Sequence, residues 1–113
     1  MTRVFKVLPA AEWDAACAQG RFDGAPVDLA DGFIHLSAAD QVAETLRRHF
    51  AGQDDLVLVA FDAAALGPAL TWEPSRGGAL FPHLYGPLPT AAGDVAPIPL
   101  TADGGFDLDG FDL

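Results

Sequence analysis

The sequence predicts an α+β fold in one small domain. Short runs rich in β-branched and aromatic residues alternate along the chain with stretches in which apolar residues recur at helical spacing. The clearest strand signal is the apolar run Leu56–Phe61, which is short enough for a buried central strand, and the clearest helix signal is Ala38–Phe50. With 113 residues, half of them hydrophobic, the chain has the size and composition of one globular unit. We expect residues 1–100 to form this domain and residues 101–113 to form an acidic tail.

The amino-terminal elements are a strand and then a helix. Arg3–Leu8 is rich in Val, Phe and Leu and is followed by Pro9, which is typical of a strand that leads into a turn. The next residues carry apolar side chains at helical spacing, and Gly20 is placed to end this helix. Because Cys17 shares a predicted helix face with Trp13, we expect it to be buried as a small hydrophobic side chain.

A loop, a short strand and the main helix follow. The loop is Arg21–Asp31, which is rich in Gly, Pro and Asp, and Gly32–Ser37 then has the apolar residues of a short strand. Ala38–Phe50 is the predicted helix. Ser37 precedes it, with Asp40 three residues on, so the pair resembles an amino-terminal capping box.

The second half of the chain reads as three further extended segments. Leu70–Glu73 is a strand that Pro74 cuts off. Pro82 within Leu80–Gly86 predicts an edge strand or an extended loop, because proline cannot donate to a central ladder. Asp94–Leu100 is a further edge strand interrupted by prolines. The tail Phe106–Leu113 alternates apolar and acidic residues, which fits either a last strand or a disordered end.

The charge balance restricts the partners. The chain has 16 acidic and 6 basic side chains and a net charge of −10, so its field repels nucleic acid phosphates and anionic membranes. Only Arg47, Arg48 and His49 form a basic cluster, which we interpret as a solvated helix face. We therefore expect no duplex nucleic acid and no membrane as partner.

A single cysteine excludes an internal disulfide. With no long apolar run and no signal-peptide pattern, we expect a cytoplasmic protein.

Two histidines are the first candidates for chemistry. His35 and His83 lie in segments that resemble strands, where nothing in the strand pattern requires a polar residue. Histidine titrates near neutrality and either ring nitrogen can donate or accept, so it suits acid–base work and contacts to ribose or phosphate. The alternative for each is a buried core histidine with satisfied hydrogen bonds. His49 reads as structural or exposed.

Further candidates surround the second histidine in the sequence. Trp72, Glu73 and Arg76 supply an aromatic ring, a carboxylate and a guanidinium beside two flexible glycines, and such a set can stack a flat ring, stabilise a cation and bind a phosphate. The alternative is a strand end with a surface Glu–Arg pair. Phe81 and Tyr85 flank His83 in a segment stiffened by proline, which favours a rigid pocket wall.

Two other uses of these residues remain open. A helix amino terminus favours anions, so Ser37 could serve a nucleotide phosphate as well as cap the helix. His35, His83 and Glu73 could also form a two-histidine, one-carboxylate metal site, although no metal-binding spacing supports this and we predict no metal.

The strings Asp31-Gly-Phe-Ile-His-Leu-Ser37 and Phe81-Pro-His-Leu-Tyr-Gly86 resemble those of a bacterial family known as domain of unknown function 952. The resemblance extends over most of the chain to about Leu100. It also includes residues outside the two strings, namely Trp13, Gln41, Thr45, Phe50, Glu73, Gly78 and Leu88.

This resemblance implies the ADP-ribosyltransferase fold, near its RNA 2′-phosphotransferase branch: a split, mostly antiparallel sheet with two main helices and NAD in the cleft. It would make His35 the ribose-binding residue with Ser37 beside it, and His83 or Tyr85 the second contact. Glu73 would stabilise the oxocarbenium-like transition state.

The combined prediction is an NAD- or ADP-ribose-binding, transferase-like enzyme that uses a cleft lined by His35 and His83. The alternative is a non-catalytic module that binds a nucleotide or another small ligand in the same cleft. The predicted catalytic residues are Glu73 and His83. The predicted ligand-binding residues are His35, Ser37, Trp72, Arg76, Phe81 and Tyr85.

Overall fold

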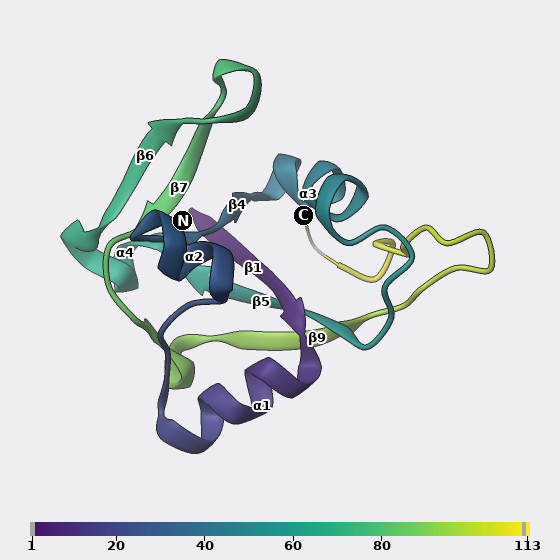
Figure 1. Ribbon diagram of the computed structural model, residues 1–113, viewed down its shortest axis with the longest axis horizontal. Helices are drawn as coiled ribbons and strands as arrows, with labels where there is room; N and C mark the ends of the chain where they lie inside the picture. Colours follow the sequence, from purple (N-terminus) through teal and green to yellow (C-terminus); the bar gives the residue numbers. More distant parts are fainter. Residues whose placement is uncertain (1, 112) are drawn as a thin grey trace.

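Three antiparallel sheets form the frame of the protein (Figure 1). The computed structural model describes residues 2–111 and 113, apart from the side chain of Arg76. The largest sheet has the order β4 (Ser37–Ala38), β1 (Arg3–Pro9), β5 (Leu56–Asp62), β9 (Asp94–Ile98). The second has the order β3 (Ile34–His35), β7 (Leu80–Leu84), β6 (Leu70–Pro74), and the third pairs β2 (Arg21–Phe22) with β8 (Leu88–Pro89). With its helices, this confirms a small α+β domain.

Helices cover both faces of the four-stranded sheet. They are α1 (Ala10–Gln19), α2 (Pro26–Asp31), α3 (Val42–His49) and α4 (Ala63–Leu66), with short 3-10 turns η1 (Ala39–Gln41), η2 (Gly67–Ala69), η3 (Arg76–Gly78) and η4 (Thr90–Ala92). α1 and α3 lie on opposite sides of β1 and β5 (Figure 1). None of the helices among the described residues is long and apolar enough to span a membrane.

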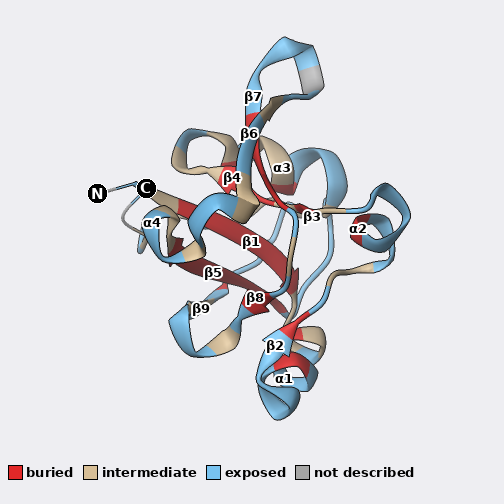
Figure 2. Cartoon of the chain, turned by 90° about the vertical axis from the view of Figure 1, so that its left-hand side faces the viewer, coloured by how far each residue is buried: buried red, intermediate tan, exposed pale blue. Residues whose placement is uncertain are grey.

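The alternation of side chains along β5 divides the core into two clusters. Val57, Val59 and Phe61 pack with α1 on one face, and the intervening residues pack with α3 on the other. β5 pairs with β1 on one side and β9 on the other, so the predictions of a central strand at 56–61 and an edge strand after Asp94 are confirmed. Figure 2 shows β1 and β5 buried along most of their length.

The two larger sheets meet where β3 passes into β4. Only Leu36 separates the two strands; β3 pairs with β7, whereas β4 pairs with β1. The β1–β4 ladder has two residue pairs, Val4↔Ala38 and Phe5↔Ser37, while β1 pairs with β5 along its whole length. Beyond Phe5, no strand among the described residues pairs with the outer edge of β1, and the candidate site lies beside this edge.

Two predictions in the first half of the chain are wrong. The segment 21–31 is not a loop throughout, because it contains β2 and α2. Pro26 suits the first position of a helix, and the Asp28 carboxylate accepts the N–H of Ala25 at the helix start. Cys17 is exposed, whereas Trp13 and Ala16 are buried; the buried face of α1 therefore includes Trp13 and Ala16 but stops short of Cys17.

Two predictions in the second half also fail. β7 is the central strand of its sheet and not an edge. The nitrogen and the carbonyl of Pro82 both face the β3 side of β7. The carbonyl accepts the N–H of Leu36, which lies one residue past the end of β3. The missing N–H of Pro82 therefore falls where β3 has already ended, and the proline is tolerated. The tail residues 106–111 form neither a strand nor a detached end: Phe106 makes an isolated bridge to Leu100, and apolar tail side chains pack against the α3 cluster.

Candidate functional site

His35 and His83 are direct neighbours on adjacent strands. They form a register pair between β3 and β7, and their ring centroids lie 5.7 Å apart. Phe33 lies two residues before His35 on the same face. Its ring stacks on that of His83, with the centroids 4.1 Å apart, and is tilted against that of His35, with the centroids 4.6 Å apart. The ring of Tyr85 lies 5.4 Å from Phe33. The two histidine-bearing strings thus converge in one aromatic cluster.

Two carboxylates of α2 hold the His35 ring. Its Nδ1 lies 2.6 Å from Oδ1 of Asp28, and its Nε2 lies 2.9 Å from Oδ2 of Asp31. A carboxylate only accepts, so Nδ1 donates to Asp28, and both contacts are hydrogen bonds at once when both nitrogens carry a proton. A buried carboxylate behind one imidazole nitrogen fixes the ring for proton transfer at the other.

Asp28 is a buried charge with several partners. Only 1% of the residue is exposed, and its oxygens accept from Lys6 Nζ at 3.1 and 3.3 Å and from the backbone N–H of Ala25 and His35. Burial alone would raise the pKa of Asp28, but the Lys6 ammonium and these hydrogen bonds hold the pKa below its usual 3.8. Burial lowers the pKa of Lys6, and the attraction of Asp28 opposes this effect.

A third carboxylate, that of Glu73, holds His83. Oε1 of Glu73 accepts from Nδ1 of His83 at 2.9 Å and from the hydroxyl of Tyr85 at 2.7 Å. The Tyr85 and His83 hydrogen bonds lower the pKa of Glu73, and the bond to Glu73 raises the pKa of Tyr85. His83 is only 5% exposed, and its Nε2 has no hydrogen-bond partner in the described part of the chain.

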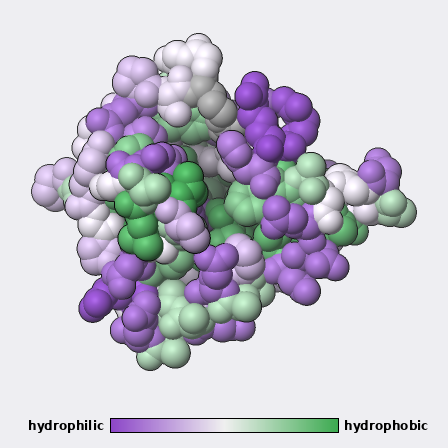
Figure 3. Space-filling model, in the orientation of Figure 1, coloured by the Kyte–Doolittle hydropathy of each residue, from purple (hydrophilic) through white to green (hydrophobic). Residues whose placement is uncertain are grey.

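Both rings line a cavity of about 670 Å³. The cavity runs along the open edge of β1 and is closed by the start of α2 and by the carboxyl end of α3. Figure 3 shows the surface hollowed between α2 and α3, with hydrophobic residues at its centre and hydrophilic ones around it. The polar and charged side chains that line it are Lys6, Glu12, Asp31, His35, Ser37, Thr45, His49, Gln53, Ser75 and His83.

The cavity brings together some of the predicted site residues. His35, Ser37, Phe81 and His83 all line it. Ser37 is buried in β4, and its hydroxyl lies 2.9 Å from that of Thr45. Its predicted role as helix cap is therefore wrong; the carboxamide of Gln41, rather than Asp40, accepts the N–H of Ala38 at this helix start.

Three other predicted residues, Glu73, Trp72 and Tyr85, do not line the cavity. Glu73 and Tyr85 reach it only through His83. Trp72 is on the opposite face of β6 from Glu73, because neighbouring strand residues alternate, and 39% of it is exposed. The side chain of Arg76 lies outside the described residues. No group of three or more potential metal ligands occurs among the side chains that are described.

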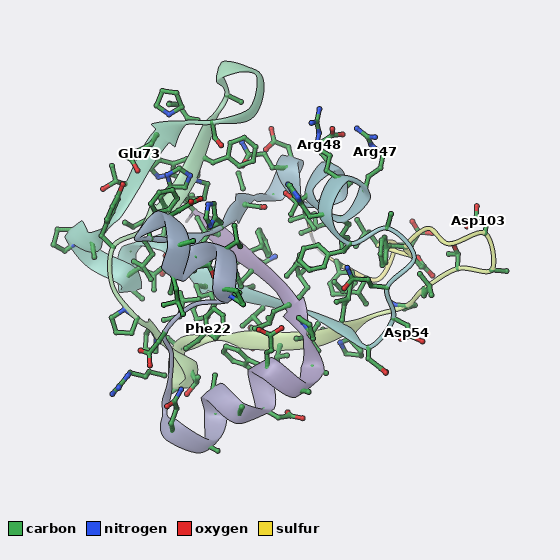
Figure 4. The ribbon with its side chains drawn as sticks, viewed as in Figure 1. Phe22, Arg47, Arg48, Asp54, Glu73 and Asp103 are labelled. Carbon is green, nitrogen blue, oxygen red and sulfur yellow. The ribbon has the colours of Figure 1, made fainter. Side chains whose placement is uncertain are left out.

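The structure adds residues that the sequence analysis missed. Lys6 is a lysine within the apolar run Val4–Leu8 of β1, but nothing in the sequence names Asp28 as its partner. His49 was interpreted as structural or exposed; it is exposed, and it also lines the cavity. Arg47 and Arg48 pair with Glu44 and extend from α3 away from the molecule (Figure 4), as expected of a solvated face.

Comparisons with known proteins identify relatives but no activity. No curated protein matches the chain. The crystal structure of protein CC0527 from Caulobacter crescentus has 56% sequence identity and a TM-score of 0.91, covering 96% of each chain. A solution structure of CC0527 has 57% identity and a TM-score of 0.85, covering 96% of this chain and 94% of the other. Both were structural genomics targets. A family model described as "Protein of unknown function (DUF952)" matches residues 7–94, so the chain belongs to the DUF952 family.

Proposed function

We propose that this protein binds a small polar molecule in the cavity between its two larger sheets, with Nε2 of His83 as a polar contact and the ring of His35 beside it on the cavity wall. The observation that carries the proposal is the Nε2 atom of His83. It belongs to a ring that lines the cavity and is more than nine-tenths buried, yet it has no partner among the described residues. Buried polar atoms are nearly always hydrogen-bonded, so this atom supports contact with a ligand.

The cavity has the size and lining of a small-molecule site. Such sites enclose roughly 300–1,000 Å³ and combine apolar walls with a few oriented polar groups. Here the apolar walls come from β1, α2, the end of α3 and β7, and the oriented groups are the two carboxylate-held imidazoles. The apolar lining includes Phe5, Leu8, Val27, Phe50 and Phe81.

The charges of the lining support the small-ligand alternative over an NAD-binding transferase. The family resemblance makes NAD and ADP-ribose the first ligands to test. However, Glu12 and Asp31 both line the cavity, and the one ammonium there, Lys6, is already paired with Asp28. A pyrophosphate would approach two carboxylates without a free cation among the lining side chains described here, which favours a ligand with little negative charge.

Glu73 fits a positioning role better than the predicted catalytic one. Stabilising a positive ribosyl centre requires a carboxylate on the cavity wall. Glu73 is not part of that wall, and its Oε1 already accepts two hydrogen bonds. It accepts from Nδ1 of His83, and in the tautomer with its proton on Nδ1, Nε2 is an acceptor for the ligand.

Thermal-shift titrations test the proposal with NAD, ADP-ribose, adenosine and nicotinamide, two charged and two uncharged probes of related structure. We expect the uncharged probes to raise the melting temperature of the wild type. His83→Asn keeps a donor near Glu73 but loses the atom at the Nε2 position, and it should lose this stabilisation, as should His35→Ala. Trp72→Ala, on the far face of β6, is the matched control and should keep it.

Two results would contradict the proposal: no stabilisation by any of the four probes, or equal stabilisation of the wild type and both histidine variants. Nicotinamide release from NAD separates a binding module from a transferase. The proposal predicts no release above that in buffer, whereas release that falls in Glu73→Gln would restore the catalytic assignment.

A further inference from the structure

The open edge of β1 carries a pair of backbone groups that the fold does not use. If the β1–β4 ladder continued two positions past the pair Phe5↔Ser37, His35 would lie opposite Val7. Its backbone is engaged elsewhere, because its N–H donates to Asp28 Oδ1 at 3.0 Å and its carbonyl accepts from Lys6 Nζ at 3.0 Å. The buried ion pair therefore ends the ladder before Val7.

The register of β1 shows which way the Val7 backbone points. At the two ends of the β1–β5 ladder, the N–H of Ala10 donates to Asp55 at 2.7 Å and the N–H of Ala63 donates to Thr2 at 2.8 Å. Even-numbered residues of β1 therefore exchange hydrogen bonds with β5, and odd-numbered ones face away from it. The N–H and C=O of Val7 point toward the open edge.

Val7 is a buried residue on the cavity wall. It is 5% exposed, and no hydrogen bond joins its N–H or C=O to any residue that the structure describes. Unpaired buried backbone groups are rare in folded proteins. Pro9, the next residue facing this edge, has no N–H, and its carbonyl is the N-cap acceptor of α1.

We infer that the cavity recognises a neighbouring C=O and N–H of an amide ligand, of which the C=O accepts from the Val7 N–H and the N–H donates to the Val7 carbonyl. The inference rests on the proposed function, because it concerns the same cavity, and it names the chemical class of the ligand. In a primary carboxamide the two groups belong to one amide. In an extended peptide they are the N–H and C=O of one residue and belong to two successive amides, because the N–H and C=O of a single trans amide point in opposite directions.

The same geometry rejects close analogues of an amide. A carboxylate cannot donate to the Val7 carbonyl and would lie in a cavity that Glu12 and Asp31 also line. A ketone accepts from the N–H but leaves the carbonyl unpaired. Loss of one hydrogen bond with a buried partner left unpaired weakens binding by about tenfold or more.

Nuclear magnetic resonance tests the inference on the ¹⁵N-labelled wild type. Isobutyramide, isobutyrate and methyl isopropyl ketone form a matched series of nearly equal shape, and acetyl-alanyl-alanine amide is the peptide arm. We expect the Val7 N–H resonance to move downfield with the amides and to move at least tenfold less at equal concentration with isobutyrate and the ketone. A larger effect of the dipeptide identifies a peptide ligand, and a larger effect of isobutyramide identifies a carboxamide.

Two variants separate the backbone from the side chain. Val7→Pro removes the N–H, and because that N–H faces away from β5, the ladder to β5 is retained. Val7→Ala shortens the side chain and keeps the N–H. We expect isobutyramide binding to be lost in Val7→Pro and kept in Val7→Ala.

Equal response to amide and ketone, or no response of the Val7 N–H to either amide, overturns the inference whether or not Val7→Pro folds. Such a result would leave the proposed function standing if the thermal shifts still depend on His83.

Discussion

Replacing Asp28 by Asn tests the buried ion pair on which the site is built. The substitution removes the charge that balances the Lys6 ammonium, a side chain only 8% exposed. Leaving one member of a buried pair uncompensated costs about 3–5 kcal/mol. With an unfolding entropy of about 2.1 cal/mol/K per residue, this lowers the melting temperature of a domain of 113 residues by roughly 13–21 °C.

Urea denaturation and calorimetry measure the effect, with Asp23→Asn as control. Asp23 forms an exposed pair with Arg21 at 2.8 Å, and such pairs contribute at most about 1 kcal/mol. A loss in Asp28→Asn as small as that in the control would refute the claim that the pair is buried and essential.

The acid limb of the stability curve gives a second readout for Asp28. Its folded-state pKa lies below the usual 3.8, so the carboxylate stabilises the native state fully above about pH 4, and this contribution is lost as the pH falls through the folded-state pKa. The wild type should therefore lose more stability than Asp28→Asn between about pH 4 and pH 2. Parallel curves for the two proteins would contradict the assignment.

Two further predictions concern the β6–β7 hairpin and the core. The pKa of Tyr85 should fall toward 10 in Glu73→Gln, because a neutral amide no longer opposes the negative charge of the phenolate. Tyr85 is the only tyrosine, so an ultraviolet titration measures its pKa directly. An unchanged titration curve would show that the hydrogen bond is absent in solution. Gly93→Ala should destabilise the fold by about 1–3 kcal/mol in urea, because the new methyl group would lie 2.7 Å from Val59, whereas Gly110→Ala meets no atom within 4 Å and should be neutral.

The elements with strong local signals were predictable. The apolar run of β5 needs burial on both faces, and a central position in a covered sheet is the arrangement that provides it. The predictions were wrong where a contact between residues far apart in the sequence determined the local structure. α2 forms in a loop-like sequence because buried Asp28 fixes its start, and Pro82 sits in a central strand because the neighbouring strand β3 ends beside it. Neither contact is visible from local sequence.

The two histidines of the site were predictable from the sequence, whereas the residues that hold them in place were not. His35 and His83 stood out as polar residues in apolar strands, and the structure places them side by side. The Lys6–Asp28 pair joins residues 22 positions apart, so no spacing rule reveals it. Glu73 was assigned to chemistry because its sequence neighbours are Trp72 and Arg76, but strand alternation turns Trp72 to the other face.

The imidazole resonances of His35 and His83 test the central claim most directly, because the account requires one ligand to meet both rings. In a titration of the ¹⁵N-histidine-labelled protein with adenosine, nicotinamide or isobutyramide, the Nε2 signal of His83 and the ring signals of His35 should move together, with a single dissociation constant. If every probe leaves the His83 Nε2 signal unchanged, or if the two rings respond with different constants, the two histidines do not share a binding site.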